Sequence, residues 1–314
     1  MRAYESVESH DHDWERPWRL MRVALIYLLD VIEVARDEVD GGLDPLVISL
    51  VSTACVAPVT QDPRLQRAYA TLDAPPPDDL RRPITINAIA GSLGLPFETV
   101  RRTVHRLAER NLVEITPRGV VQSEAAVLDE SYVRLAGARY DRTRRLYADL
   151  RALGVALPGP DDPEPLAGPP VRIVNRLIGE YTLRMVERLM RWTGEPLRGL
   201  MLLEIARASA DHLDLQAFSG PEPISDAQRR AVRISEDARR LKLPNETVRR
   251  HLQALEADGL LKRRPQGYFI SAAKLGGDDA REATVGALQD FRRFAEKLGQ
   301  LGVLAWWDDE ARRV

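Results

Sequence analysis

Apolar residues recur along two stretches of the chain at the spacing of a helix that buries one face. Between residues 97 and 109, Val100, Val104 and Leu107 fall at i, i+4 and i+7. This spacing predicts an apolar stripe that faces a core and leaves a polar outer side. The stretch from 245 to 257 repeats the pattern. Its inward residues are Val248, Leu252 and Leu255.

Two longer helices are expected at about residues 17–39 and 172–192, and both are apolar on more than one face. A helix with so little polar surface has to be buried on several sides. Two interpretations remain open. Either the helices belong to the core of their own half, or they form an interface between the halves or between two chains. A homodimer through these helices is therefore one expected assembly.

The two amphipathic stretches belong to an internal repeat. Residues 95–123 and 243–271 align without a gap at an offset of 148, and twelve of their 29 positions are identical. The similarity continues at the same offset in residues 144–155 and 292–303. A repeat of this length indicates a duplicated structural unit.

Each half is expected to contain the same elements in the same order: the long helix, a second helix, a short strand, two helices, a two-stranded hairpin and a closing helix. The second helices are placed at about 45–59 and 196–213. A proline-rich stretch cannot continue a helix and divides the chain near its middle. The predicted domains are a flexible tail at 1–16, a first half at 17–157, a linker at 158–170 and a second half at 171–314.

Turn residues indicate how the repeated helices are connected. Gly94-Leu95-Pro96 marks a tight turn, with proline expected at the first helical position, where its missing N–H costs little. Asn111 and Gly259 stand where a left-handed residue ends a helix. Proline and glycine then mark the tip of a short β-hairpin in both copies. Two helices with a tight turn and a following hairpin make a winged helix-turn-helix, whose second helix lies in the DNA major groove.

The motif L-x-x-x-T-V-R-R-x-x-x-x-L, followed by a glycine-containing wing, resembles the winged-helix domains of the bacterial IclR, GntR and MarR regulators. The resemblance covers about 83–123 and 231–271. The flanking helices are similar in order to the MarR fold, where they form the dimer interface. The resemblance implies a mainly α fold, with two winged helix-turn-helix domains from internal duplication, long flanking helices and small β-wings. No separate effector-binding domain of the IclR or GntR kind is apparent.

Carried over by position in the motif, the resemblance implies that the outer side of each second helix and each wing lie near DNA. In the first copy these residues are Phe97, Glu98, Thr99, Arg101, Arg102, His105 and the wing residue Arg118. In the second copy they are Asn245, Glu246, Thr247, Arg249, Arg250 and the wing residues Arg263 and Arg264.

The residue types suit this role. Arginine pairs bidentately with guanine or clamps a phosphate, and the threonines in the first turn can donate to a phosphate oxygen. Glu98 and Glu246 either accept from a cytosine amino group or complement the helix dipole, and the second role is favoured.

The two copies are not equivalent. Phe97 stands opposite Asn245, and Thr103 opposite His251, in the alignment. The second wing carries Lys-Arg-Arg where the first carries Glu-Ile-Thr. If both copies bind DNA, the two half-sites should differ in sequence. If one copy has lost DNA binding, the first copy is the expected loser.

Charge and composition restrict the alternatives. The whole chain has a net charge of −2. Each repeated segment holds five basic against three acidic residues, so each is +2, which is compatible with DNA binding. The single cysteine, Cys55, excludes an intrachain disulfide and favours the cytoplasm. It is expected to be a buried, unreactive thiol. The longest apolar run is too short to span a membrane, and no secretory signal precedes it.

Other chemistry is not indicated. The sequence contains no phosphate-binding glycine loop and no nucleophile–base set, so neither an enzyme nor a cofactor is expected. The segment His10 to Asp13 has metal-ligand residue types, but a polar tail without a metal is the favoured interpretation. Trp14, Trp18, Trp306 and Trp307 are expected to be packing anchors.

The predicted function is sequence-specific binding of duplex DNA as a cytoplasmic transcriptional regulator. The helices 97–109 and 245–257 would enter successive major grooves about 34 Å apart, and one fused chain would suffice for bivalent contact. Tandem winged helices also occur in plasmid replication initiators and in chromosome-condensation accessory proteins that bind protein partners. Both remain alternatives. Whether an effector ligand binds is not determined by the sequence.

Overall fold

The fold of this computed structural model is mainly α-helical, with two small two-stranded antiparallel sheets, as the sequence predicted. The structure describes residues 17–39, 42–157, 159–160 and 164–313. The His10 to Asp13 segment and Trp14 lie outside these residues.

We call residues 17–157 the first half and residues 171–313 the second half. The first half contains α1 Pro17–Val39, α2 Asp44–Cys55, α3 Ala57–Gln61, α4 Pro63–Ala68, the 3₁₀ helix η1 Asp78–Leu80, α5 Ile86–Leu93, α6 Phe97–Glu109, β1 Glu114–Thr116, β2 Gly119–Val121 and α7 Glu130–Ala152. The second half contains α8 Val171–Thr193, α9 Pro196–Ala208, the 3₁₀ helices η2 Leu215–Phe218 and η3 Asp226–Gln228, α10 Ile234–Leu241, α11 Asn245–Ala257, β3 Lys262–Arg264, β4 Gly267–Phe269, α12 Ala272–Leu275, α13 Asp278–Gln300 and α14 Val303–Arg313.

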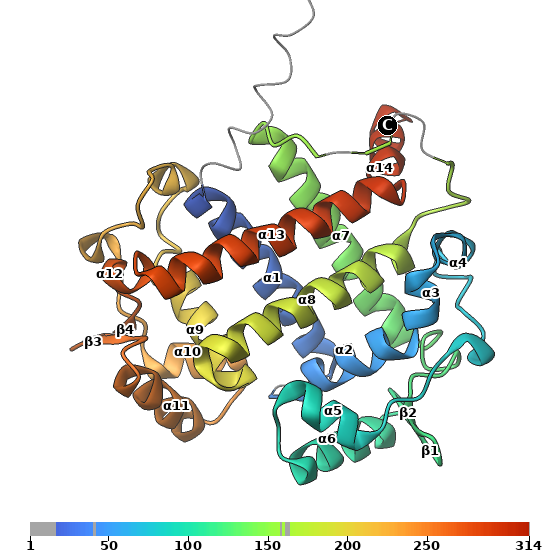
Figure 1. Ribbon diagram of the computed structural model, residues 1–314, viewed down its shortest axis with the longest axis horizontal. Coiled ribbons are helices and arrows are strands. Elements are labelled where there is room, and N and C mark those ends of the chain that lie inside the picture. Colours follow the sequence, from blue (N-terminus) through green and yellow to red (C-terminus); the bar gives the residue numbers. More distant parts are fainter. Residues whose placement is uncertain (1–16, 40–41, 158, 161–163, 314) are drawn as a thin grey trace, which may run out of the picture.

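Four long helices, α1, α7, α8 and α13, run through the centre of the molecule (Figure 1). Their buried side chains form one hydrophobic core to which both halves contribute. Tyr27 of α1, Tyr181 of α8 and Phe294 of α13 meet there, with the ring centroids of Tyr181 and Phe294 5.2 Å apart. Aromatic pairs at this separation add to the stability that burial provides.

α1 is buried both in its own half and against the other half, so both interpretations of its apolar faces apply. The helix packs against α7 of its own half and against α9 and α13 of the other half. The second interpretation therefore holds for the two halves of one chain. A homodimer through these helices stays a prediction, and it would have to use the faces that α1 and α8 leave exposed.

Each of the two short helix pairs rests partly on the long helix of the other half. In the first pair, the turn at Gly94 lies so close to α8 that an added Cβ would stand 2.8 Å from the Cε of Met190. In the second pair, Lys242 donates from its Nζ to the backbone oxygen of Arg36 at 3.2 Å and to the Asp37 carboxylate at 2.9 Å. Arg36 itself is buried and lies 3.1 Å from the buried carboxylate of Glu204 on α9. The relative placement of the halves is thus fixed by side-chain contacts as well as by the shared core.

Two further cores lie under the helix pairs. One gathers residues of α1, α2, α5, α6 and β2, and the other gathers residues of α9, α10, α11 and β4. Cys55 is fully buried in the first of them, as predicted. Trp307 is also buried and donates from its indole nitrogen to the Tyr140 hydroxyl at 2.7 Å, which confirms it as an anchor. Trp306 and Trp18 are half-buried.

The second helices are shorter than predicted. α2 ends at Cys55, because Pro58 has no N–H to continue the bonding ladder, and the separate helix α3 follows. α9 ends at Ala208, and the next carbonyl, that of Ser209, accepts from the N–H of Arg230 at 2.9 Å. Within the ranges that the structure describes, no helix has the length and apolarity needed to cross a membrane.

Candidate nucleic-acid interface

Two segments with matching elements carry most of the predicted site residues. We call residues 84–121 the first motif and residues 232–269 the second motif. Ile84 and Val120 exchange backbone hydrogen bonds of 2.9 and 2.8 Å, and Val232 and Tyr268 exchange bonds of 2.8 and 2.9 Å. These bridges, the helix starts and the strands all recur at the offset of 148. The short strand expected before the helices is therefore a single bridge in each motif.

The turn between the two helices of each motif uses a left-handed residue. Gly94 has a φ of +59° and Lys242 a φ of +53°. Glycine takes this conformation without strain, whereas lysine pays a steric cost. Pro96 and Pro244 come just before α6 and α11, and their carbonyls accept from Val100 and Val248. The prediction of proline at the first helical position is thus wrong by one residue, because the proline supplies the cap.

The ends of α6 and α11 follow the sequence prediction. Asn111 has a φ of +57° and Gly259 a φ of +71°. The backbone N–H of the residue after each of them bonds back to the helix, from Leu112 to Leu107 at 3.0 Å and from Leu260 to Leu255 at 2.9 Å. This pattern satisfies a carbonyl at the helix end and turns the chain into the hairpin.

The predicted hairpins are present in both motifs. In the first, Thr116 pairs with Gly119, and in the second, Arg264 pairs with Gly267. Both glycines have a positive φ, of +132° and +147°. A Cβ at Gly119 would stand 2.7 Å from the backbone oxygen of Ile84, and a Cβ at Gly267 would collide with that of Val232. Glycine is therefore required where the hairpin crosses the bridge strand.

The predicted division of α6 and α11 into inner and outer faces is confirmed. All six residues assigned to the inner faces are fully buried. Phe97, at the start of α6, is 49% exposed. The exposed residues of the predicted site are Phe97, Glu98, Arg101, Arg102, His105, Arg118, Asn245, Glu246, Arg249, Arg250 and Arg263. Thr99, Thr247 and Arg264 are half-buried. α6 and α11 both lie along the lower edge of the view in Figure 1.

The acidic residue of each outer face pairs with arginine. Glu98 accepts two hydrogen bonds from Arg101, both 2.9 Å, and one from Arg102 at 3.1 Å. These bonds lower the pKa of Glu98 to about 2. Spacings of three and four residues along a helix allow such pairs, so the sequence contained the signal. The dipole role favoured from sequence is compatible with this pairing, since the carboxylates stay ionised in the first turn.

The second motif has a different balance on its outer face. Glu246 accepts bonds of 2.9 and 2.6 Å from Arg249, and these bonds lower the pKa of its carboxyl group. Arg250 makes no hydrogen bond or ion pair with any residue that the structure describes. One arginine of α11 is therefore unpaired, whereas Arg101 and Arg102 of α6 share Glu98.

The guanidinium of Arg264, predicted to lie near DNA, is instead bonded within the chain. It donates to the backbone oxygens of Arg229 and Asp226 at 2.8 and 2.7 Å and stacks 4.0 Å from the ring centroid of Phe269. These contacts hold the loop after η3 to the hairpin. Lys262 and Arg263 are the exposed cations of β3.

The difference between Thr103 and His251 does not reach the surface. Both side chains are buried, which corrects their use as evidence that the two outer faces differ. The Nδ1 of His251 lies 2.8 Å from the Glu195 carboxylate, and burial lowers the pKa of the imidazole. The outer faces differ instead at Phe97 and Asn245 and in the wings.

Several basic residues near the motifs were not predicted. Arg106 of α6 forms an ion pair with the buried Asp44 of α2 and so holds the helix to its core. Arg230 and Arg233 flank the bridge residue Val232 and are exposed. The resemblance pointed only to the second helix and the wing, so the cations on the strand that enters the motif were not predicted.

Comparison of the chain with protein-family models, curated proteins and solved structures finds no significant match.

Proposed function

We propose that the first and second motifs are winged helix-turn-helix units of a duplicated fold, and that the chain binds duplex DNA in a sequence-specific way as a transcriptional regulator. One observation carries the proposal. Two helices with the same exposed Glu-x-x-Arg-Arg set are each preceded by a tight turn and followed by a β-hairpin, at a constant offset of 148. The recurrence of the same exposed residues on the same arrangement of elements suggests that both motifs bind the same kind of partner.

The chemistry of the second motif supports DNA contact more strongly. The unpaired guanidinium of Arg250 is available to a phosphate or to a guanine edge. Lys262 and Arg263 on the hairpin and Arg233 before α10 add exposed positive charge around α11. Cations at such positions bind the phosphate backbone and set the orientation of the helix.

The central helices suggest how two motifs act together. Since α1, α7, α8 and α13 form one core, the two motifs are connected through packed helices as well as through the linker. Two helix-turn-helix units bind successive major grooves when they are about 34 Å apart. A single chain would then bind two half-sites of different sequence.

The test is selection from a pool of random duplex DNA by the wild-type chain. Two double variants, Arg101→Ala/Arg102→Ala and Arg249→Ala/Arg250→Ala, are compared with the control Arg312→Ala. Arg312 is an exposed arginine on α14, paired with Asp309 at 3.2 Å, and so has the same chemistry outside the motifs.

We expect a two-part DNA motif from the wild type and the control. Each double variant should lose one part and bind about 10- to 100-fold less tightly. The Arg249/Arg250 variant should show the larger loss. Absence of enrichment by the wild type at low salt would refute DNA binding. Selection of many iterated copies of one element would favour the replication-initiator alternative.

A second candidate applies to the first motif, where the surface favours a protein partner. Phe97 is 49% and Ile115 42% exposed, and they are two large apolar residues on α6 and β1. The neighbouring Glu114 is exposed, and Glu98 pairs with Arg101 and Arg102. An apolar surface with little free positive charge suits a protein better than a phosphate backbone. In this case the Arg101/Arg102 variant would select the same DNA as the wild type.

A further inference from the structure

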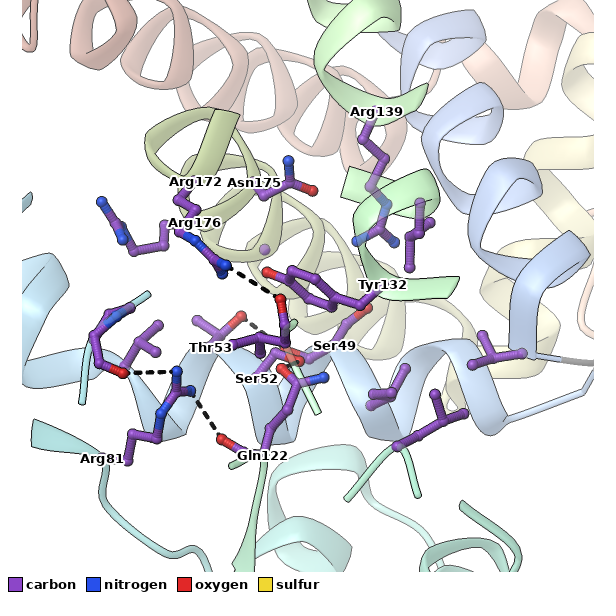
Figure 2. Close-up of a pocket in the computed structure, with 18 of the residues that line it drawn as sticks. Ser49, Ser52, Thr53, Arg81, Gln122, Tyr132, Arg139, Arg172, Asn175 and Arg176 are labelled. Atoms are coloured by element: carbon purple, nitrogen blue, oxygen red, sulfur yellow. Dashed lines mark hydrogen bonds between the residues drawn. The ribbon is translucent and has the colours of Figure 1, made fainter. Parts of the chain in front are cut away.

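A cavity of about 80 Å³ lies between α2, α7, α8 and the segments that flank the first motif. Four arginines contribute to its lining, and Figure 2 shows where they come from. Arg172 and Arg176 extend from α8, Arg139 from α7, and Arg81 from the loop after η1. Four guanidinium groups around one small cavity form an unusually high concentration of like charge.

Three of these arginines are fixed by main-chain oxygens. Arg81 donates to the carbonyl of Gln122 at 2.8 Å, and Arg172 donates to the carbonyls of Thr71, Leu72 and Val127 at 2.6–3.1 Å. Arg176 donates to the carbonyls of Tyr69 and Gln66 at 2.9–3.0 Å. Carbonyl groups orient a guanidinium but do not neutralise its charge.

Little negative charge is available nearby. Within the described residues, the one carboxylate paired with these four arginines is that of Asp78, which lies 3.3 Å from the Nε of Arg81 and is itself 66% exposed. Burial lowers the pKa of all four guanidinium groups. Burial and then the charge of Arg172 lower the pKa of Arg176 to about 10. A buried cationic cluster of this kind is costly unless an anion compensates it.

Arg139 has unused donors, and it lines both this cavity and a second one between α1, α2, α8 and α9. Its Nε donates to the carbonyl of Val31 at 3.3 Å, and its two terminal nitrogens make no hydrogen bond with the described part of the chain. In addition, the Nε of Arg176 is buried without a hydrogen-bond partner, and Arg176 is only 7% exposed. Buried donors in native proteins normally find a partner, so each unsatisfied one needs a reason.

The remaining lining limits what fits. Ser52 donates to the amide oxygen of Gln122 at 2.7 Å, and the ring of Tyr132 lies under the guanidinium of Arg172. A cavity of about 80 Å³ has several times the roughly 10–15 Å³ that one water needs. It therefore has room for a small polyatomic anion but not for a nucleotide.

We propose that this cavity binds a small oxyanion, a phosphate group or a short dicarboxylate, with Arg139 as its direct partner. The planar guanidinium matches the geometry of both groups, since it presents paired donors to two oxygens. Arg81, Arg172 and Arg176 supply the positive field that draws the anion in. The proposal does not depend on DNA binding, because it concerns a cavity behind the first motif and not its outer face.

The experiment measures binding of two probes, inorganic phosphate and succinate, by calorimetry and by thermal unfolding, with chloride at equal ionic strength as the reference. The test variant is Arg139→Gln. The control is Arg145→Gln, on the same helix, which removes an exposed arginine that has no hydrogen bond within the described residues. We expect saturable binding of one probe by the wild type and the control. The affinity of Arg139→Gln for that probe should be lower by about tenfold or by more. The probe that binds shows whether the ligand is a phosphate group or a short dicarboxylate.

Two results would overturn the proposal. One is that neither probe raises the unfolding temperature beyond the chloride reference. The other is that Arg139→Gln binds as tightly as the wild type. If Arg139→Gln does not fold, Arg139→Lys replaces it. Lysine keeps the charge and loses the paired donors, so affinity should fall while the fold remains.

Discussion

The first motif buries Ile89 on α5, whereas the second motif buries Asp237 at the matched position on α10, 148 residues later. Both motifs nevertheless have the same helix bounds, turns and hairpins relative to each other. The two motifs share the left-handed turn conformations and the hairpin glycines. Residue identity differs at other positions, even at a fully buried one.

The outer faces of the two motifs also differ. The first motif joins two arginines to one glutamate and exposes Phe97, while the second leaves Arg250 unpaired beside a basic hairpin. A common backbone thus carries two different surfaces. Three experiments test how far this comparison holds.

The largest effect is expected from Asp237→Leu, which gives the second motif an apolar residue like that of the first. Neither carboxylate oxygen of Asp237 has a hydrogen bond among the described residues, and burial raises its pKa to about 8. The folded chain therefore keeps a proton that the unfolded chain releases near pH 4. The stability that the fold gains from the raised pKa of Asp237 is fully present below about pH 4 and is lost as the pH rises through about 8.

The variant should be more stable than the wild type at pH 9 by on the order of 4 kcal/mol. About 3 kcal/mol of this advantage should appear between pH 6 and pH 9. Urea unfolding at the two pH values measures it. Glu236→Gln removes a more exposed carboxylate from the same helix, whose charge is one of the smaller causes of the raised pKa of Asp237, and it should change the pH dependence much less. An Asp237→Leu variant with the same pH dependence as the wild type would show that Asp237 is ionised in the fold.

The next effect concerns the hairpin glycines. Gly267→Ala should destabilise the chain by about 3 kcal/mol, and Gly119→Ala by less. The reason is that a Cβ at Gly267 meets the bridge strand more closely than one at Gly119. Gly91→Ala is the control, since nothing lies within 4 Å of a Cβ there. Thermal unfolding of the three variants gives the order, and equal losses at Gly119 and Gly267 would mean that the two hairpins adapt alike.

The smallest effect is expected from freeing the paired arginines. Glu98→Gln releases Arg101 and Arg102, while Glu246→Gln releases only Arg249. DNA binding by the first motif should strengthen about twofold to fivefold, and that by the second motif less. Fluorescence anisotropy on each selected half-site measures this, with Glu130→Gln on α7 as the control. Weaker binding by Glu98→Gln would indicate that the glutamate orients the arginines or contacts a base.

Local patterns account for most of what the sequence predicted correctly. The apolar stripes at i, i+4 and i+7, the left-handed Asn111 and Gly259, and the proline- and glycine-marked hairpins each depend on a few neighbouring residues. The Glu98 and Arg101 pair depends on spacing as well and was within reach of the sequence. The break of the second helix at Pro58 was also signalled and was missed.

The arginine cavity could not be predicted in this way. Arg81, Arg139 and Arg172 are 58 and 33 residues apart along the chain, and only the packing of α8 against the first half brings them together. Asp237 was equally hidden, because a carboxylate next to Arg239 and Arg240 suggests a solvent-facing side. The only sequence signal was its alignment with Ile89.

The contact between α1 and α9 has one further consequence. It contains the buried pair of Arg36 and Glu204, while the residue that matches Glu204 at an offset of 151 is Thr53, which lies against Gly179 of α8. In a symmetric dimer every such contact occurs twice, so each substitution must suit both copies. In this chain the two matched contacts differ in chemistry, so a substitution at Glu204 alters one contact between the halves and leaves the other as it is.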